Sequence, residues 1–287
     1  MPKIGVLGGS GLYKMEGMSD VSEQWLETPY GEPSDCYMLG VLDGIEVAFL
    51  PRHARGHQLL PSELNARANI YGFKLLGVEW LIAVGAVGSL KEEIHPLDIV
   101  MVDQFVDRTN SGRKMTFFGE GVAAHIGFAD PVCPVLHSIL LECAELSRAR
   151  VHPTGTYINM EGPAFSTRAE SKLYRSWGMD VIGMTNLVEA KLAREAEICY
   201  ATMAMVTDYD VWHEEEDDVS IGTVIENLTK NAQCAENVIR MATQNIPQER
   251  TCDCPRTLDH AMITDPSLIP ESAKDRLRLL LGDRLQG

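Results

Sequence analysis

The sequence predicts an α/β fold, a single domain with a central mixed twisted sheet flanked by helices. The first observation is an apolar run from residue 198 to 207, which is long enough for a buried strand. Its Val, Tyr and Thr residues favour an extended backbone, and its alanines allow helices to pack closely on both faces. The second observation is size, because 287 residues with 45% hydrophobic content can bury a large core.

Residues 1–246 are expected to form this domain. Residues 247–287 are expected to form a tail with a terminal helix, packed on the domain or on a neighbouring subunit. The remaining apolar patterns fill the domain with alternating strands and helices. The predicted strands cover residues 3–7, 36–42, 45–50, 80–88, 98–106, 154–160, 180–184 and 198–207. The predicted helices cover residues 61–76, 134–146, 186–196, 219–246 and 271–281.

Charge and cysteine content narrow the class of protein. The formal net charge is -16 and the sequence pI is about 4.9, which argues against a nucleic-acid or anionic-membrane surface. The N-terminal apolar run is too short for a signal peptide, and no run of about 18 apolar residues could span a bilayer. The seven cysteines are scattered, with Cys252 and Cys254 the only close pair. We therefore expect a reduced, cytoplasmic protein without a zinc site.

The apolar run at 198–207 ends in Asp208-Tyr209-Asp210. In a strand, positions two apart point the same way, so both carboxylates would approach one ligand together. Ligands in open α/β sheets lie beyond the carboxyl ends of the strands. The alternative is that these residues form a polar turn in front of the acidic run at 214–218.

A glycine-rich turn, Gly8-Gly9-Ser10-Gly11, directly follows the first predicted strand. Its backbone N–H groups and the Ser10 hydroxyl could bind an oxyanion. The glycine spacing differs from the dinucleotide fingerprint, and no acidic residue ends a clear second strand about 20 residues on. A dinucleotide site is therefore disfavoured, and a tight turn without a ligand stays open.

A basic segment follows the predicted strand at 45–50. Arg52, His53, Arg55 and His57 emerge together in a strongly acidic chain. Arginine can hold a phosphate through two parallel hydrogen bonds, so this cluster indicates an anion site. A solvated basic loop is the alternative.

Small and aromatic residues follow two further strands. Gly85 and Ala86 would let a ligand lie against bare backbone, although close helix packing could require the same residues. Phe165 stands just before a capping box made by Thr167 and Glu170, where its ring could stack on a flat ligand. His125 lies in a long loop, where a lone histidine is more often a surface residue than a site residue.

These motifs together resemble the trimeric purine nucleoside phosphorylase family. The resemblance rests on the glycine turn, Arg52-His53, Gly162-Pro163-Ala164-Phe165-Ser166, Met184-Thr185 and Thr207-Asp208-Tyr209-Asp210, in that order. It runs from Ile4 to about Ile246 and leaves the tail poorly covered.

The resemblance implies phosphorolysis, in which phosphate attacks C1' of a purine nucleoside while the base departs. It implies that Asp208 faces N7 of the purine and Asp210 accepts from a 6-amino group. A carboxylate accepts from an amine but not from a 6-oxo group, so adenine nucleosides are favoured, with S-methyl-5'-thioadenosine as the expected substrate. Inorganic phosphate is the co-substrate, and neither a cofactor nor a metal is implied. The implied phosphate site consists of Ser10, Arg52, His53, Thr185 and the backbone near Gly85 and Ala86.

The resemblance also implies how the rest of the nucleoside is held. Phe165 would pack on the purine and Met184 on the ribose. The 5' end would meet Ile221, Val224 and Ile225, with His57 and His125 at the margin. The family assembles as homotrimers in which His125 would lie near a neighbouring subunit's site.

Four positions depart from the relatives that act on methylthioadenosine. These usually have threonine at Gly85, arginine at Ala164, asparagine at Gly183 and proline at Val188. Three alternative functions therefore stay open: phosphorolysis of inosine, guanosine, adenosine or methylthioinosine, hydrolysis of a nucleoside, and nucleoside binding without catalysis. A hydrolase would not need Arg52 and His53 beside a glycine turn.

Overall fold

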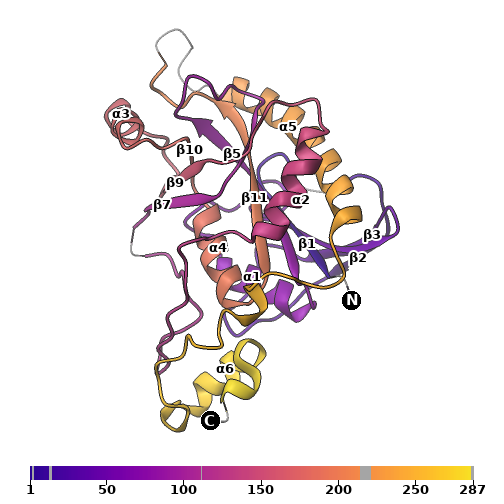
Figure 1. Ribbon diagram of the computed structural model, residues 1–287, viewed down its shortest axis with the longest axis vertical. Helices are drawn as coiled ribbons and strands as arrows, with labels where there is room; N and C mark the ends of the chain where they lie inside the picture. The colour runs from indigo at the N-terminus through magenta and orange to yellow at the C-terminus, as the bar shows by residue number, and fades with distance from the viewer. Residues whose placement is uncertain (2, 13–14, 111, 214–220, 286–287) are drawn as a thin grey trace.

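The computed structural model describes residues 1–287 except 2, 13–14, 111, 214–220 and 286–287. Its described strands form one mixed sheet with helices on both faces, as the sequence predicts (Figure 1). The strands are β1 (Ile4–Gly8), β2 (Met18–Gln24), β3 (Tyr37–Leu42), β4 (Ile45–Pro51), β5 (Trp80–Ser89), β6 (Ile99–Met101), β7 (Gln104–Arg108), β8 (Val151–His152), β9 (Thr156–Met160), β10 (Val181–Gly183) and β11 (Cys199–Asp208). The α-helices are α1 (Ala66–Leu75), α2 (Pro134–Glu145), α3 (Arg168–Ser176), α4 (Asn186–Glu195), α5 (Ile221–Asn245) and α6 (Glu271–Leu281).

Strands β5 and β11 form the centre of the sheet. They run parallel and stay paired from Trp80 opposite Cys199 to Val87 opposite Val206. Nearly every residue of both strands is buried, because helices cover both faces. The pairing shifts between Val206 and Asp208, so the end of β11 carries a bulge.

The other edge of β5 has two partners with a gap between them. The parallel ladder with β1 ends where Leu7 faces Ala83. The antiparallel ladder with β10 begins where Ile182 faces Gly88. The four residues of β5 from 84 to 87 therefore lie between two ladders on this edge, and we call this stretch the ladder gap. It leaves backbone N–H and C=O groups of a buried strand facing a cavity instead of a neighbouring strand.

The expected hairpin is present. Asp43 and Gly44 both have positive φ, 49° and 86°, as a two-residue turn between right-twisted strands requires. The turn joins β3 to β4, and β4 continues the sheet as a parallel neighbour of β1. Strand β2, which the sequence does not predict, pairs with β3 at the sheet edge, and its mostly exposed residues carry no apolar alternation.

The single strand predicted over 98–106 is wrong, because two strands occupy this segment. Strand β6 pairs with β11, whereas β7 pairs with β9 far along the sheet. The chain leaves one ladder at Val102-Asp103, and Asp103 Oδ1 accepts from Gly155 N at 3.0 Å. A continuous apolar pattern cannot reveal such a change of partner.

Two helix layers cover the sheet. Alternate residues of the central strands meet different helices: Leu81 and Tyr200 share a core with α1 and α4, whereas Ile82 and Met203 share one with α2 and α5. Figure 1 shows α2 and α5 side by side, with α4 and α1 nearer the lower end. The capping box predicted for Thr167 and Glu170 starts α3.

Helix α1 begins later than the predicted start at Pro61. Asn65 is its N-cap and accepts from Ala68 N at 3.2 Å, so the first turn starts at Ala66. Residues 61–63 form a turn before the helix. The missed signal is Asn65 itself, a good capping residue inside the predicted helix.

The tail after residue 246 packs on the α1–α4 side of the molecule. Its buried apolar residues join the same core as Phe117 and Val122, and Figure 1 places α6 at the lower end of the chain. Arg284 reaches Glu197 at 3.0 Å and Asp259 at 2.6 Å. The buried tail residues in this core are Leu258, Ala261, Ile269, Ala273, Leu277, Leu280, Leu281 and Leu285, whereas Cys254 is buried in the core next to α2 and α5.

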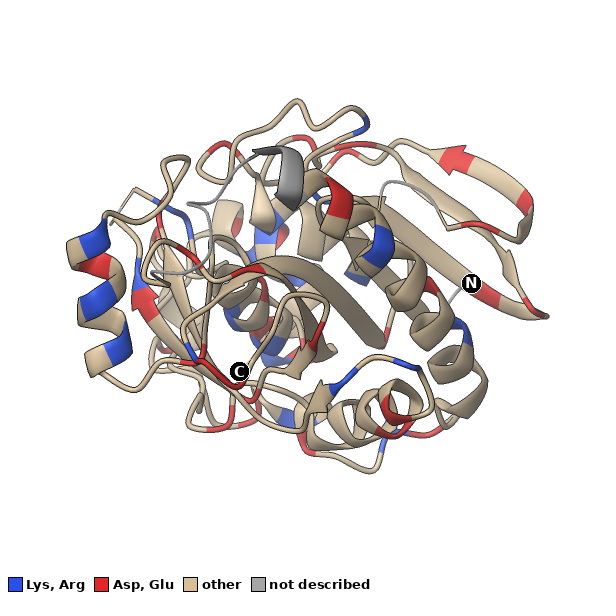
Figure 2. Cartoon of the chain, turned by 90° about the horizontal axis from the view of Figure 1, so that it is seen from above, with Lys and Arg blue, Asp and Glu red and all other residues tan. Residues whose placement is uncertain are grey.

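Acidic positions are spread over most elements, with basic ones interspersed (Figure 2). Within the described part of the chain, no helix is both long and apolar enough to cross a membrane.

Candidate active site

A cavity of about 320 Å³ opens beside the ladder gap. This volume is large enough for a small ligand. The cavity is bordered by the turn after β1, the end of β4, the segment 183–185 before α4, and the end of β11. The predicted site residues that line it are Ser10, Arg52, His53, His57, Gly85, Ala86, Phe165, Met184, Thr185, Asp208 and Asp210.

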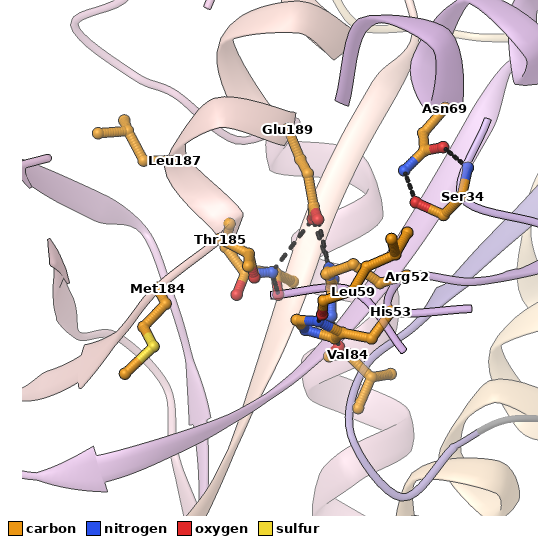
Figure 3. A network of polar contacts seen from close by, with 12 residues as sticks. Ser34, Arg52, His53, Leu59, Asn69, Val84, Met184, Thr185, Leu187 and Glu189 are labelled. Atoms are coloured by element: carbon orange, nitrogen blue, oxygen red, sulfur yellow. Dashed lines mark hydrogen bonds and ion pairs between the residues drawn. The ribbon is translucent and has the colours of Figure 1, made fainter. Parts of the chain in front are cut away.

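Arg52 lies almost fully buried at one end of this cavity, 1% exposed. Its guanidinium contacts both carboxylate oxygens of Glu189, with Nη2 at 3.0 Å from Oε2, and Nη1 donates to Val84 O at 2.8 Å (Figure 3). Attraction to Glu189 offsets the cost of burying the charge and keeps the pKa of Arg52 above its ordinary value. Glu189 therefore fixes the orientation of Arg52, and the sequence gives no sign of this partner.

The Arg52 contact also shows which way the ladder gap faces. Val84 O points to the Arg52 side. Backbone groups alternate between the two edges of a strand, so the N–H and C=O of Ala86 point to the same side. Ala86 lines the cavity, as the sequence predicts, with a backbone donor directed into it.

Thr185 contributes a hydroxyl at the N-terminus of α4. It is the N-cap residue, yet its side chain makes no capping hydrogen bond within the helix. Figure 3 shows it beside Met184, facing the space next to Arg52 and His53. A helix N-terminus with a hydroxyl that is not used for capping and an arginine nearby is well suited to an anion.

His53 is buried next to Arg52, and its ring stacks on His57 with centroids 4.4 Å apart. Its Nδ1 lies 2.8 Å from Leu59 O. Burial, assisted by the Arg52 charge, lowers the pKa of His53 to about 4. The ring is therefore neutral at pH 7, and because a carbonyl can only accept, Nδ1 carries the proton and Nε2 is an acceptor.

Arg55, predicted to join this cluster, points elsewhere. It reaches the exposed Glu23 at 2.6 Å and the buried Asp35 at 3.1 Å, and it does not line the cavity. The basic segment thus divides between a buried arginine in the site and an exposed one outside it.

Asp208 and Asp210 lie at the other end of the cavity, but not for the reason the sequence suggests. Strand β11 ends at Asp208, and Asp210 has a positive φ of 54°. The two carboxylates converge because the chain turns back, and Asp210 N donates to Asp208 Oδ1 at 2.8 Å. The polar-turn alternative is thus correct locally, yet the turn places both acids in the site.

Burial sets the protonation of this pair. It raises the pKa of Asp208, and the neighbouring charge of Asp210 raises it further, although hydrogen bonds from Thr207 and Asp210 N oppose the shift. Burial also raises the pKa of Asp210, although the nearby hydroxyls of Ser171 and Ser166 oppose the shift. Within the described residues, Asp210 Oδ2 is buried without a hydrogen-bond partner. An unpaired buried oxygen of this kind is available to a ligand donor.

Three residues that the sequence analysis passed over hold this site in shape. Arg113 joins two of its segments, since its Nε lies 3.1 Å from Glu161 and its guanidinium also contacts Met184 O. Asn227 and Asn231 of α5 donate to the carbonyls of Thr207 and Val206 at 2.8 and 2.9 Å, which fastens the end of β11. Each bonds a backbone carbonyl, a role without a sequence motif.

Gly85 and Gly183, two of the four positions that depart from the relatives acting on methylthioadenosine, have a steric explanation. A Cβ on Gly85 would lie 2.7 Å from Asn186 Oδ1, and a Cβ on Gly183 would lie 2.0 Å from the Tyr157 hydroxyl. Asn186 and Tyr157 are both buried. Larger residues at these glycines would therefore require Asn186 and Tyr157 to move.

Some predicted residues do not line the cavity. Ile225 is 57% exposed, and Leu228, one turn further along α5, lines it instead. The side chains of Ile221 and Val224 lie outside the described residues. His125 is exposed, and its backbone N donates to Ala261 O in the tail at 2.8 Å.

The chain belongs to the phosphorylase superfamily, whose family description matches residues 3–243. Two similar proteins are S-methyl-5'-thioadenosine phosphorylases. The one from Geobacter sulfurreducens is 59% identical over 97% of this chain and 98% of its own length, and the one from Koribacter versatilis is 56% identical over 98% and 96%.

Solved structures agree in fold. A methylthioadenosine phosphorylase from an Antarctic soil metagenomic library superposes with a TM-score of 0.91 at 48% identity, over 97% of this chain and 98% of that one. A methylthioadenosine phosphorylase from Schistosoma mansoni, in complex with adenine, gives a TM-score of 0.83 at 34% identity over 87% and 93%. The predicted family and fold class are thereby confirmed.

Proposed function

We propose that this enzyme cleaves S-methyl-5'-thioadenosine with phosphate, giving adenine and 5-methylthioribose 1-phosphate. One observation carries the proposal: a single cavity joins an anion-binding end at Arg52 and Thr185 to a pair of buried carboxylates at Asp208 and Asp210. The similarity to methylthioadenosine phosphorylases along nearly the whole chain supports it.

Phosphate would occupy the end formed by the ladder gap. Arg52 supplies charge, Ser10 and Thr185 supply hydroxyls, and Ala86 supplies a backbone donor beside Gly85. Arg52 already gives donors to Glu189 and Val84, so it would offer phosphate only its remaining N–H groups. This arrangement would hold the attacking oxygen in a fixed position, which is how positioning contributes to catalysis.

His53 would meet phosphate through Nε2. Because Nδ1 is turned toward Leu59 O, neutral His53 can only accept there, and it would bind the P–OH group of hydrogen phosphate. The histidine would then select a phosphate that still carries a proton and orient its other oxygens toward the sugar.

At the base end, the two acids would have different roles. Phosphate oxygen forms a bond to C1' as the bond from C1' to N9 breaks, and the electron pair of that bond moves into the purine. Asp208, with its raised pKa, would give a proton to N7. Asp210 would accept from the 6-amino group through its unpartnered Oδ2. The remaining nucleoside would rest on Phe165 and Met184, with Leu228 near its apolar end.

Turnover of methylthioadenosine with and without phosphate tests the proposal. Adenine release is expected only with phosphate, in equal amount to the sugar phosphate. Asp208→Asn should lower kcat by about 10²- to 10⁴-fold while moving KM much less. Adenine release without phosphate would indicate a hydrolase, and binding without turnover would indicate a binding protein. Faster turnover of inosine or methylthioinosine would overturn the substrate assignment but not the reaction class.

A further inference from the structure

The structure brings four scattered cysteines together at the start of β11, which is the end of the strand away from the active site. Cys133, Cys199, Cys252 and Cys254 have sulfur atoms that all lie within 4.8 Å of one another. Three of them are buried, and Cys252 is half-buried. The spacing of these cysteines along the chain resembles no four-ligand zinc site, yet their sulfurs meet in the folded structure. They come from three distant segments, which sequence spacing cannot connect.

We propose that these four cysteines, which we call the sulfur cluster, bind one zinc ion. Zinc bonded to four thiolates has Zn–S distances of about 2.3 Å, so its tetrahedron has sulfurs about 3.8 Å apart. The sulfurs of Cys199 and Cys252 are 3.3 Å apart. A set of four sulfurs at these separations can converge on one central ion with small side-chain adjustments. Four thiolates without an oxygen or nitrogen donor favour zinc over calcium or magnesium.

The surroundings favour the thiolate form that a metal requires. Cys133 is the N-cap of α2, where the helix N-terminus stabilises negative charge. With four thiols this close together, one divalent cation would displace their protons and bind the thiolates.

The position of the sulfur cluster assigns the metal a structural role. Cys199 begins β11 and Asp208 ends it, so the cluster lies about 30 Å from the carboxylates at about 3.3 Å per residue. Cys252 and Cys254 belong to the start of the tail, whereas Cys133 and Cys199 belong to the sheet and α2. Zinc would therefore fasten the tail to the domain just before its buried residues begin. The metal would close long loops of the chain, and in theory a crosslink stabilises a fold most when the loop that it closes is long.

Two disulfides are the competing arrangement of the same sulfurs. Each would require an oxidant and would use the cysteines as pairs rather than as one set. The structure holds all seven cysteines as free thiols, and within the sulfur cluster each sulfur is near the other three. Four sulfurs grouped around one centre favour a metal over two separate disulfides.

The test is the metal content of the tag-free full-length chain, purified with a reductant and without chelators, then supplied with zinc and dialysed. We expect about one zinc per chain by mass spectrometry of the metal. Cobalt put in its place should give thiolate charge-transfer and tetrahedral ligand-field absorption. Cys252→Ser should lower the zinc content to near none. Cys234→Ser, which changes another half-buried cysteine outside the cluster, should keep one zinc.

Two outcomes would overturn the proposal. One is a wild-type chain that retains no zinc and no cobalt after reconstitution while all its thiols react freely. The other is an intact mass that lacks two hydrogens per bonded pair, which would assign disulfides instead. The cobalt spectrum of the wild-type chain keeps the test decisive even if Cys252→Ser fails to fold.

Discussion

The tight turn at the end of β11 gives Asp208 and Asp210 different surroundings, although their side chains are chemically identical. Asp208 accepts from Thr207 Oγ1 at 2.6 Å and from Asp210 N at 2.8 Å, so both its oxygens are engaged. Asp210 Oδ2 has no partner in the described part of the chain. Burial raises the pKa of both acids, and the negative charge of Asp210 raises that of Asp208 further, so the two groups titrate as a pair. The open Oδ2 is the feature that suits Asp210 to the proposed acceptor role.

Replacing Asp210 by asparagine should therefore change the preferred base. The amide can donate to a 6-oxo group, where the carboxylate can only accept. For Asp210→Asn we expect the ratio of kcat/KM for methylthioadenosine to that for methylthioinosine to fall by about 100-fold or more. An unchanged ratio would remove Asp210 from the base-binding part of the site.

A second prediction concerns the ion pair between Arg52 and Glu189. Lysine cannot reproduce the two parallel bonds to Glu189, so Arg52→Lys should raise the KM for phosphate by about 10- to 100-fold and change the KM for nucleoside much less. The free energy of unfolding should also fall, because Glu189 loses a fitted partner in a buried site. Steady-state kinetics with each substrate varied and urea denaturation give the two measurements.

Arg55→Lys is the matched control, since Arg55 follows the same strand but makes its ion pairs with Glu23 and Asp35 outside the cavity. It should leave both KM values unchanged. Equal increases in the two KM values for Arg52→Lys would make Arg52 a purely structural residue.

Helix α4 links the site to the core of the molecule. Thr185 caps its start, Glu189 holds Arg52 one turn later, and Glu195 at its end accepts from Thr116 Oγ1 and Phe117 N, both at 2.7 Å. Burial raises the pKa of Glu195 to about 7, although these two bonds oppose the shift. A single helix therefore carries Thr185, which is a proposed phosphate ligand, the residue that orients Arg52, and an anchor for the loop that contains Phe117.

Glu195 should make stability depend on pH. Its pKa is about 7 when folded and 4.5 in the reference state, so the folded form binds the extra proton between these values. The contribution of Glu195 is fully present below pH 4.5 and is lost as pH rises through 7. Between about pH 5 and 8, the free energy of unfolding of the wild type should fall by up to about 3 kcal/mol more than that of Glu195→Gln.

Glutamine fits this site, since its oxygen can accept from Phe117 N while its amide donates to the Thr116 hydroxyl. Glu226→Gln, at an exposed position of α5, is the control and should keep the wild-type pH dependence. Parallel pH profiles for Glu195→Gln and the wild type would contradict the raised pKa.

Long elements with a regular pattern could be predicted, and short or partner-switching ones could not. The hairpin at Asp43-Gly44 and strand β11 carry strong local signals. The division of 98–106 into β6 and β7 depends on which strands lie beside them, which local sequence does not encode. The same holds for the site. Arg52 and Asp208 could be predicted because they lie at the ends of predicted strands, whereas Glu189 and Arg113 could not, because their partners lie far away in the sequence.

We propose that the protein is a homotrimer, because His125 does not line the cavity of its own chain. The loop that carries it is held by the tail through His125 N to Ala261 O and an antiparallel bridge between Ala124 and Met262. The loop is therefore shaped within the chain but directed outward. A cyclic head-to-tail interface would place it beside a neighbouring site in each of three subunits.

Light scattering should accordingly give the mass of a trimer, and His125→Ala should raise the KM for methylthioadenosine several-fold without changing that for phosphate. His260→Ala, at another exposed loop position, should change neither. A fully active monomer would contradict the assembly. An unaltered KM in a trimeric His125→Ala protein would contradict the role of the histidine alone.

The ladder gap in β5 bears on how this enzyme can change over evolutionary time. Its donor at Ala86 belongs to the main chain, so no single side-chain replacement removes it, provided that the strand stays in register. Substitutions around it, such as those at Gly85 and Gly183, can then accumulate with compensation from Asn186 and Tyr157. Under the proposed function, the capacity to bind phosphate would be inherited with the sheet topology, while substitutions among the side chains around it would alter the preferred nucleoside.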